Sequence, residues 1–126
     1  MAIQYTVNEK GNPLNPEQAR KWYANAKSTG DVNLRTLGKE IAARSTVSPA
    51  DTQAVLVALN EVLVEHLADG KIVRLGDFGA FQVSIGSEGA ETAEKFNASM
   101  IKSSKVVFRP GIDLKEMQNN LKYEKL

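Results

Sequence analysis

The chain has 126 residues, a formal net charge of +1 and no cysteine. This length allows one domain with a modest core, and the missing cysteine excludes a disulfide framework and a thiolate metal site. A charge so close to zero does not by itself indicate nucleic acid or a membrane surface as a partner. No apolar run approaches the roughly 20 residues of a membrane span, and residues 1–7 lack a basic leader, so we expect a cytoplasmic protein.

The charge is distributed unevenly along the sequence. Residues 1–30 carry +2, residues 71–83 carry +1 and residues 102–126 carry +3. Residues 31–70 carry −3 and residues 84–101 carry −2. The basic surplus therefore lies toward the two ends, and the acidic surplus lies in the first helices and in one loop.

The N-terminal segment predicts a strand followed by a short helix. Residues 2–8 alternate apolar and polar side chains, which is typical of a strand. After a segment rich in glycine, asparagine and proline, residues 17–27 predict a helix whose apolar side includes Trp22 and Tyr23. We expect residues 1–32 to form an extension, with its strand paired to the main sheet and the two aromatic residues covering an edge.

Two helices are predicted next, over about residues 34–45 and from Ser48 to about Asp69. In the second helix Ser48 is placed as the N-cap and Gly70 as the C-terminal stop. Its apolar residues cover much more than one stripe, whereas a small domain buries only one face of a helix. An identical subunit is the simplest source of a second covering surface, so we predict an obligate homodimer centred on this helix.

The remaining sequence predicts a glycine-kinked hairpin, a third strand and a last helix. Gly76 and Gly79 stand where a turn needs a backbone conformation that side chains disfavour. A polar stretch at 86–95 separates the hairpin from the third strand. The predicted strands cover about 71–76, 79–85 and 99–108, the helix covers 112–121, and the tail 122–126 is either a final strand or a tether.

Two ordered motifs carry a resemblance to a known family. They are Gly70-x-x-Val73-x-Leu75-x-x-Phe78-Gly79-x-Phe81-x-Val83 and Phe108-Arg109-Pro110-Gly111-x-x-Leu114-Lys115. In order and spacing, over about residues 33–117, the chain resembles the bacterial HU and integration-host-factor family of histone-like DNA-binding proteins. The whole chain is more similar to the extended HU-like proteins of Bacteroides-type bacteria.

The resemblance implies an α+β fold and an architectural role. It implies an HU-like intertwined dimer, with a helical hairpin base, an antiparallel β saddle and a β arm over about 84–103, in a domain spanning 33–126. In the family, basic arms wrap the minor groove and a proline at the tip wedges between base pairs. Phosphate contacts and counterion release then supply the affinity, without readout of base edges.

This sequence departs from that pattern in the arm. Residues 87–94 contain three glutamates and no proline, and Ser84 and Gly86 stand where the family has an Arg-x-Arg pair. Because acidic residues that face phosphates oppose binding, we do not transfer the arm's role to this chain. The basic residues that remain are the predicted DNA contacts: Lys71, Arg74, Lys102, Lys105, Arg109 and Lys115.

These features predict a non-enzymatic homodimer that binds double-stranded DNA in the nucleoid, largely without sequence specificity. The alternative is an HU-scaffold structural or protein-interaction dimer that has lost DNA binding, its lysines being solvated residues that discourage edge pairing. We predict no catalytic residue, cofactor, metal or small-molecule substrate. The only histidine, His66, is more simply a partner of the helix dipole, and Glu61 and Glu65 lie at the spacing of a solvated helix surface.

Overall fold

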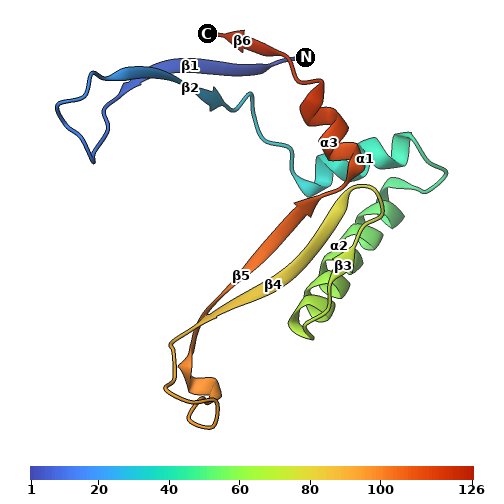
Figure 1. Cartoon of the computed structure of the whole chain (residues 1–126). Coiled ribbons are helices and arrows are strands. Elements are labelled where there is room, and N and C mark those ends of the chain that lie inside the picture. The colour runs from blue at the N-terminus through green and yellow to red at the C-terminus, as the bar shows by residue number, and fades with distance from the viewer. The chain divides into compact units, whose positions relative to one another are not determined.

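The computed structural model describes residues 1–126 and divides into two compact units. Unit 1 comprises Met1–Asn33 and Met117–Leu126, and unit 2 comprises Leu34–Glu116. Each unit contains its own three-stranded sheet (Figure 1). None of the helices combines the length and the apolar character that crossing a membrane would require.

Unit 1 is built from both ends of the chain. Strand β1 (Ile3–Lys10) lies at the centre of the sheet, antiparallel to β2 (Lys21–Lys27) and parallel to β6 (Tyr123–Lys125). The Ile3 amide donates to the Lys122 carbonyl over 2.8 Å, and the Leu126 amide donates to the Tyr5 carbonyl over 3.0 Å. The strand predicted at 2–8 is thus confirmed, and the tail is a strand. The expected pairing of β1 with the main sheet is wrong, because its two neighbours are β2 and β6.

The helix predicted at 17–27 is wrong as well. Its first residues belong to the hairpin loop, and the remainder forms β2. The pairing register puts Trp22, Ala24 and Ala26 on one face of the sheet, and Tyr23 and Asn25 on the other. Trp22 is 65% exposed, so the expected role of this aromatic residue as a cover is not seen within the chain.

The helices of unit 2 are α1 (Leu34–Ala43) and α2 (Pro49–Ala68), and both were predicted. The Ser48 hydroxyl accepts a hydrogen bond from the Asp51 amide over 3.1 Å, which confirms Ser48 as the N-cap of α2. A Cβ atom at Gly38 would overlap the Gln53 amide group, which would have to move to admit it. The Gln53 amide nitrogen in turn donates to the Arg35 carbonyl over 3.0 Å.

A single copy of the chain has almost no buried core. No large apolar side chain is buried within it, and the only buried polar side chain is that of Thr52, which is 4% exposed. Five apolar residues of α2 remain between 41% and 60% exposed: Val55, Val57, Leu59, Val62 and Val64. Since one stripe of α2 faces its own unit and these residues do not, the helix retains apolar surface for a second partner.

The second sheet has the order β3-β4-β5 and is antiparallel throughout. Its strands are β3 (Val73–Arg74), β4 (Gly79–Ser87) and β5 (Ile101–Pro110), which confirms the three predicted strands with a shorter first one. Strands β4 and β5 form a long ribbon, which the loop 88–97 and a 3-10 turn, η1 (Ala98–Met100), close at its far end (Figure 1). Helix α3 (Ile112–Asn119) follows β5, begins in unit 2 and ends in unit 1.

The hairpin turn and the start of α3 are tied together by backbone contacts. Gly76 has a φ of +53°, the left-handed conformation that favours glycine in this turn. The Gly111 amide donates to the Phe78 carbonyl over 2.8 Å, and the Asp113 amide donates to the Asp77 carbonyl over 3.1 Å. A Cβ atom at Gly111 would collide with the backbone of Asp77. Glycine is therefore required at both sides of this corner.

Replacing Gly111 by alanine is expected to destabilise the protein by about 3 kcal/mol, because rigid backbone must move to admit the methyl group. The free energy of unfolding, measured by urea titration, tests this. Gly89→Ala is the matched control, since a Cβ atom there meets nothing within 4 Å. Equal stability of the two variants would contradict the close approach at the corner.

Candidate nucleic-acid interface

One face of the β3-β4-β5 sheet is apolar. The register places Phe81 opposite Phe108 and Val83 opposite Val106. The Phe81 and Phe108 ring centroids lie 4.7 Å apart, and the Phe78 ring lies 5.7 Å from that of Phe108. These contacts join the hairpin turn to β5, so the two aromatic residues of the first motif and the one that opens the second form a single cluster.

The opposite face of this sheet carries cations. Arg74 pairs with Ala80 across β3 and β4, and Ala80 pairs with Arg109 across β4 and β5. The two arginines therefore flank one alanine, with their backbones about 10 Å apart. Lys105 is on the same face, opposite Ser84 and about 13 Å along β5 from Arg109. We call Arg74, Lys105 and Arg109 the cationic face.

A hollow of about 180 Å³ lies between the two arginines. Arg74 and Arg109 line it together with Gly79, Gly111 and neighbouring small residues, and no acidic side chain lines it. A Cβ atom at Gly79 would lie 2.5 Å from the Arg109 carbonyl oxygen, so the tight backbone here depends on glycine. Neither guanidinium makes an ion pair within 4.0 Å. Two unpaired guanidinium groups beside a small hollow are suited to a phosphate, which they can bind in a bidentate manner.

The other predicted contacts lie outside the cationic face. Lys102 is the extra residue at a β-bulge, because Gly86 pairs with Ser103 and Ser87 pairs with Ile101. Its Nζ lies 4.0 Å from Glu88 Oε1. Lys102 therefore stands at a bulge near an acidic side chain, whereas Lys105 belongs to the cationic face.

Lys71 and Lys115 lie outside the β-strands. Lys71 precedes β3, and its Nζ lies 3.2 Å from Asp69 Oδ2 and 3.5 Å from His66 Nδ1. Its charge is therefore shared with a neighbouring carboxylate. Lys115 lies in the first half of α3, where its side chain is exposed and its amide donates to the Gly111 carbonyl over 3.1 Å. It makes no ion pair within 4.0 Å.

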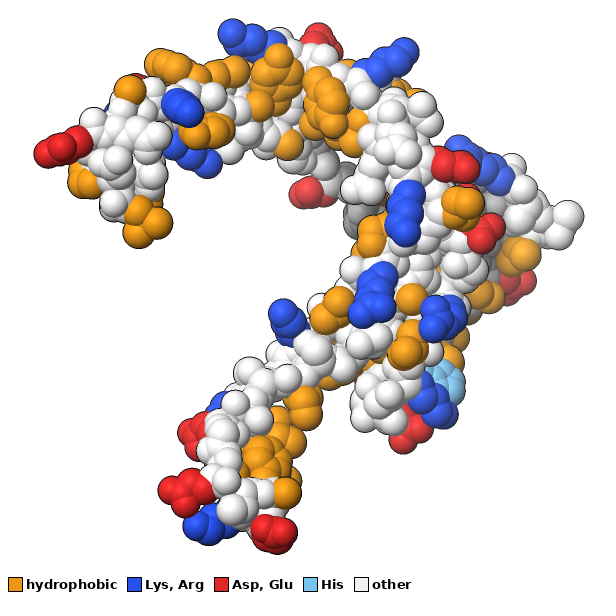
Figure 2. Space-filling model, in the orientation of Figure 1, with side chains coloured by type: hydrophobic (Ala, Val, Ile, Leu, Met, Phe, Trp, Pro, Cys, Tyr) orange, Lys and Arg blue, Asp and Glu red, His pale blue; other side chains and the backbone are white.

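The far end of the β4–β5 ribbon is acidic. Glu91 Oε2 lies 3.0 Å from Lys95 Nζ, in an exposed pair, and Glu88 faces Lys102 as described. Figure 2 shows acidic side chains gathered at this end and basic ones further back along the ribbon. Sequence reasoning missed Phe96, which is 40% exposed in the loop and is the only aromatic residue between Phe81 and Phe108.

No three carboxylate or imidazole side chains gather closely enough to hold a metal ion.

Comparison with known proteins assigns nearly the whole chain to one family. The sequence model of the HU-HIG family, described as an HU domain fused to wHTH, Ig or a glycine-rich motif, matches residues 1–125. The chain belongs to the HU-HIG family. This assignment confirms the resemblance that the two motifs carried, and it extends over the unit-1 segments as well as the HU-like motifs. No curated protein matches the chain.

A solved structure shares the fold of this HU-HIG chain. It is the crystal structure of a candidate bacterial DNA-binding protein from Bacteroides vulgatus, with a TM-score of 0.67 and 13% sequence identity. The alignment covers 99% of this chain and 48% of that one, so the chain spans about half the length of its relative. At this identity the likeness shows the α+β fold, and the dimer stays a prediction.

Proposed function

We propose that the chain is a non-enzymatic, HU-like protein of the nucleoid that binds double-stranded DNA as a homodimer, largely without sequence specificity. The observation that carries this proposal is the cationic face, where Arg74 and Arg109 flank a hollow free of acidic side chains. Membership of an HU family and the DNA-binding description of the Bacteroides relative support it.

The binding energy comes from phosphates. Each guanidinium offers parallel N–H donors to a phosphate and releases the cations condensed on the duplex. The uncharged residues on the face of Arg74, Lys105 and Arg109 are mostly short or apolar, namely Ala80, Ser84 and Val107, and Gln82 is the one long polar side chain among them. Contacts to phosphates position a protein on DNA without reading its sequence, so we expect weak sequence preference.

The homodimer doubles this surface. Helix α2 leaves five apolar residues at least 41% exposed, and the single chain has no buried apolar core. A second copy that covers α2 would supply the missing core, and two cationic faces would then act on one duplex. Arg74, Lys105 and Arg109 from both copies provide six positive groups.

One observation favours the alternative, an HU-scaffold dimer that interacts with protein instead of DNA. Unit 2 contains ten basic and eleven acidic residues, so its net charge is −1. Three glutamates of the loop 88–97 face solvent at the end of the ribbon. A surface of this kind repels a duplex wherever the cationic face does not meet it.

A mobility-shift titration of the full chain with a duplex, at about 50 mM and about 200 mM salt, separates these proposals. We expect the logarithm of the association constant to fall linearly with the logarithm of the salt concentration, with a slope of about −5 for six phosphate contacts. Two duplexes of equal length and unrelated sequence should bind within about tenfold of each other. No complex at about 50 mM salt and roughly 10 μM protein would overturn DNA binding and leave the alternative.

A further inference from the structure

The positive charge of this protein is concentrated outside the HU-like motifs. Unit 1 contains six basic and four acidic residues, giving +2, whereas unit 2 has a net charge of −1. A proposal that places all DNA contacts in unit 2 therefore leaves the more basic unit without a role. Two of the cations of unit 1, Lys10 and Lys21, lie at the end of the β1–β2 hairpin.

Two lysines lie directly opposite each other at the end of the β1–β2 hairpin. The register pairs Lys10 with Lys21, and the next pair on the same face is Asn8 with Tyr23. Like charges directly opposite each other destabilise an antiparallel pair. Glu9, the only acidic residue of the two strands, pairs with Trp22 and so lies on the other face. The hairpin thus holds an unfavourable pair that no carboxylate of its own strands offsets.

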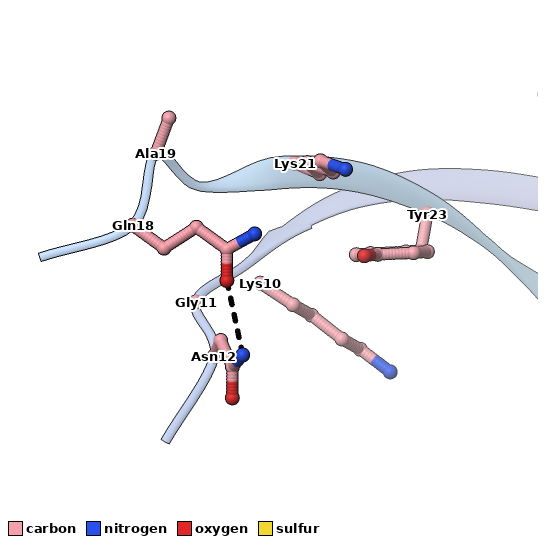
Figure 3. Close-up of a pocket in the computed structure, with 7 residues that line it drawn as sticks. All are labelled: Lys10, Gly11, Asn12, Gln18, Ala19, Lys21 and Tyr23. Atoms are coloured by element: carbon pink, nitrogen blue, oxygen red, sulfur yellow. Dashed lines mark hydrogen bonds between the residues drawn. The ribbon is translucent and has the colours of Figure 1, made fainter. Parts of the chain in front are cut away.

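The same side chains surround a hollow. Lys10, Lys21 and Tyr23 line a cavity of about 360 Å³ at the hairpin end, as Figure 3 shows. The Asn12 amide nitrogen donates to Gln18 Oε1 over 3.0 Å, which closes the loop beneath it (Figure 3). The two lysines are exposed, and neither makes an ion pair within 4.0 Å.

A third cation lies beside this hollow. The Arg20 Nε is 3.4 Å from the position that a Cβ atom on Gly11 would take, and Gly11 lines the hollow. Arg20 also lacks an ion pair within 4.0 Å. Glu17, the acidic residue of the hairpin loop, makes no ion pair with these cations, and neither Glu17 nor Arg20 is one of the residues that line the hollow. We call Lys10, Arg20, Lys21 and Tyr23 the hairpin site.

We propose that the hairpin site binds the phosphate backbone of duplex DNA and is a second DNA contact, separate from the cationic face. The two lysines and the phenol hydroxyl that line the hollow, with Arg20 next to Gly11, are donors that phosphates accept from, and a bound phosphate removes the repulsion between Lys10 and Lys21. Unit 1 and unit 2 then each offer their own contact to DNA. This inference rests on the proposed function, DNA binding. The hairpin site can nevertheless be disproved while DNA binding by the cationic face still holds.

The test compares two variants of the full chain that lose the same charge from the same unit. Lys10→Gln with Lys21→Gln removes the opposed lysines of the hairpin site. Lys122→Gln with Lys125→Gln is the control, because Lys125 pairs with Tyr5 on the other face of the sheet and Lys122 precedes β6. DNA affinity is measured by fluorescence anisotropy over a range of salt concentrations.

We expect the hairpin variant, which loses four lysines in the dimer, to lose between 3 and 4 units of salt slope and about a thousandfold in affinity at about 100 mM salt, while the control keeps the wild-type slope. The hairpin variant should unfold at no lower temperature than the wild type, since it loses a repulsive pair. Equal slopes for the two variants would overturn the hairpin site while leaving DNA binding in place. Absence of DNA binding by the wild type would overturn the proposed function itself.

Inorganic phosphate distinguishes a backbone site from a site for a free anion. With about 10 mM phosphate replacing chloride at constant ionic strength, we expect DNA affinity to change less than twofold, because a single phosphate gains nothing from the second contact. Selective displacement of DNA from the wild type but not from the hairpin variant would show that the site prefers a free anion, and would overturn the assignment.

Discussion

Replacing Arg74 and Arg109 together by glutamine is expected to weaken duplex binding by about a thousandfold in the dimer. Each charge-assisted contact to a phosphate is worth about 1 kcal/mol net, and two copies lose four of them. The salt slope should fall in magnitude by between 3 and 4, at about 0.9 per phosphate. Anisotropy titrations at several salt concentrations measure both quantities.

The matched control for this variant removes the same charge from another surface of unit 2. Arg35→Gln with Arg44→Gln changes two exposed arginines in and just after α1, neither of which is in a strand of the β3-β4-β5 sheet. We expect its salt slope to change by less than 1, because these arginines are not part of the cationic face. If both double variants lost the same slope, net charge alone would explain binding and the cationic face would have no special role.

The double variant also tests the alternative function. An HU-scaffold dimer that has lost DNA binding would show no difference between wild type and the Arg74 and Arg109 variant at any salt concentration. Lys102 provides an internal comparison, because its Nζ lies 4.0 Å from Glu88 and its position is a bulge. Lys102→Gln is expected to lower DNA affinity less than Lys105→Gln, which removes a charge from the cationic face.

The helices and the ribbon were predictable because their signals are local. Ser48, a proline after it and Gly70 bound α2 within the sequence, and the capping bond to Asp51 follows from that pattern. The glycines of the hairpin likewise mark a turn that their conformation requires. The site was predictable in part, since Arg74, Lys105 and Arg109 share a face in the observed register.

The features that the sequence did not predict correctly have physical causes. The β-bulge at Lys102 could not be read from the sequence, because it arises from the pairing of β4 with β5 and not from a local pattern. In β2, adjacent Trp22 and Tyr23 suggested a helix, although Trp22, Ala24 and Ala26 alternate with polar neighbours. The pairing of β1 with β6 joins residues near position 4 to residues near position 124, and no local pattern signals such a contact.

A charge placed on the exposed apolar surface of α2 should disrupt the predicted dimer. Val62→Asp is expected to abolish the dimer and, with it, the folded structure. Val62 is 46% exposed in the single chain and forms a stripe with Val55 and Leu59, which are 60% and 41% exposed. Burying an unpaired carboxylate costs about 3 kcal/mol per subunit, and the dimer buries two, so association weakens by roughly ten-thousandfold.

Loss of association should also unfold the chain, because one copy has no buried apolar core of its own. Sedimentation equilibrium and far-ultraviolet circular dichroism at micromolar concentration measure the two effects. Ala54→Asp is the matched control, since it places the same side chain on α2 at an exposed position two turns before Glu61, outside the stripe of Val55, Leu59 and Val62. It carries the helix-propensity cost of aspartate without burying a charge within that stripe. A stable folded monomer of the wild type, or a Val62→Asp dimer as tight as that of Ala54→Asp, would contradict the dimer and leave the apolar surface of α2 to another partner.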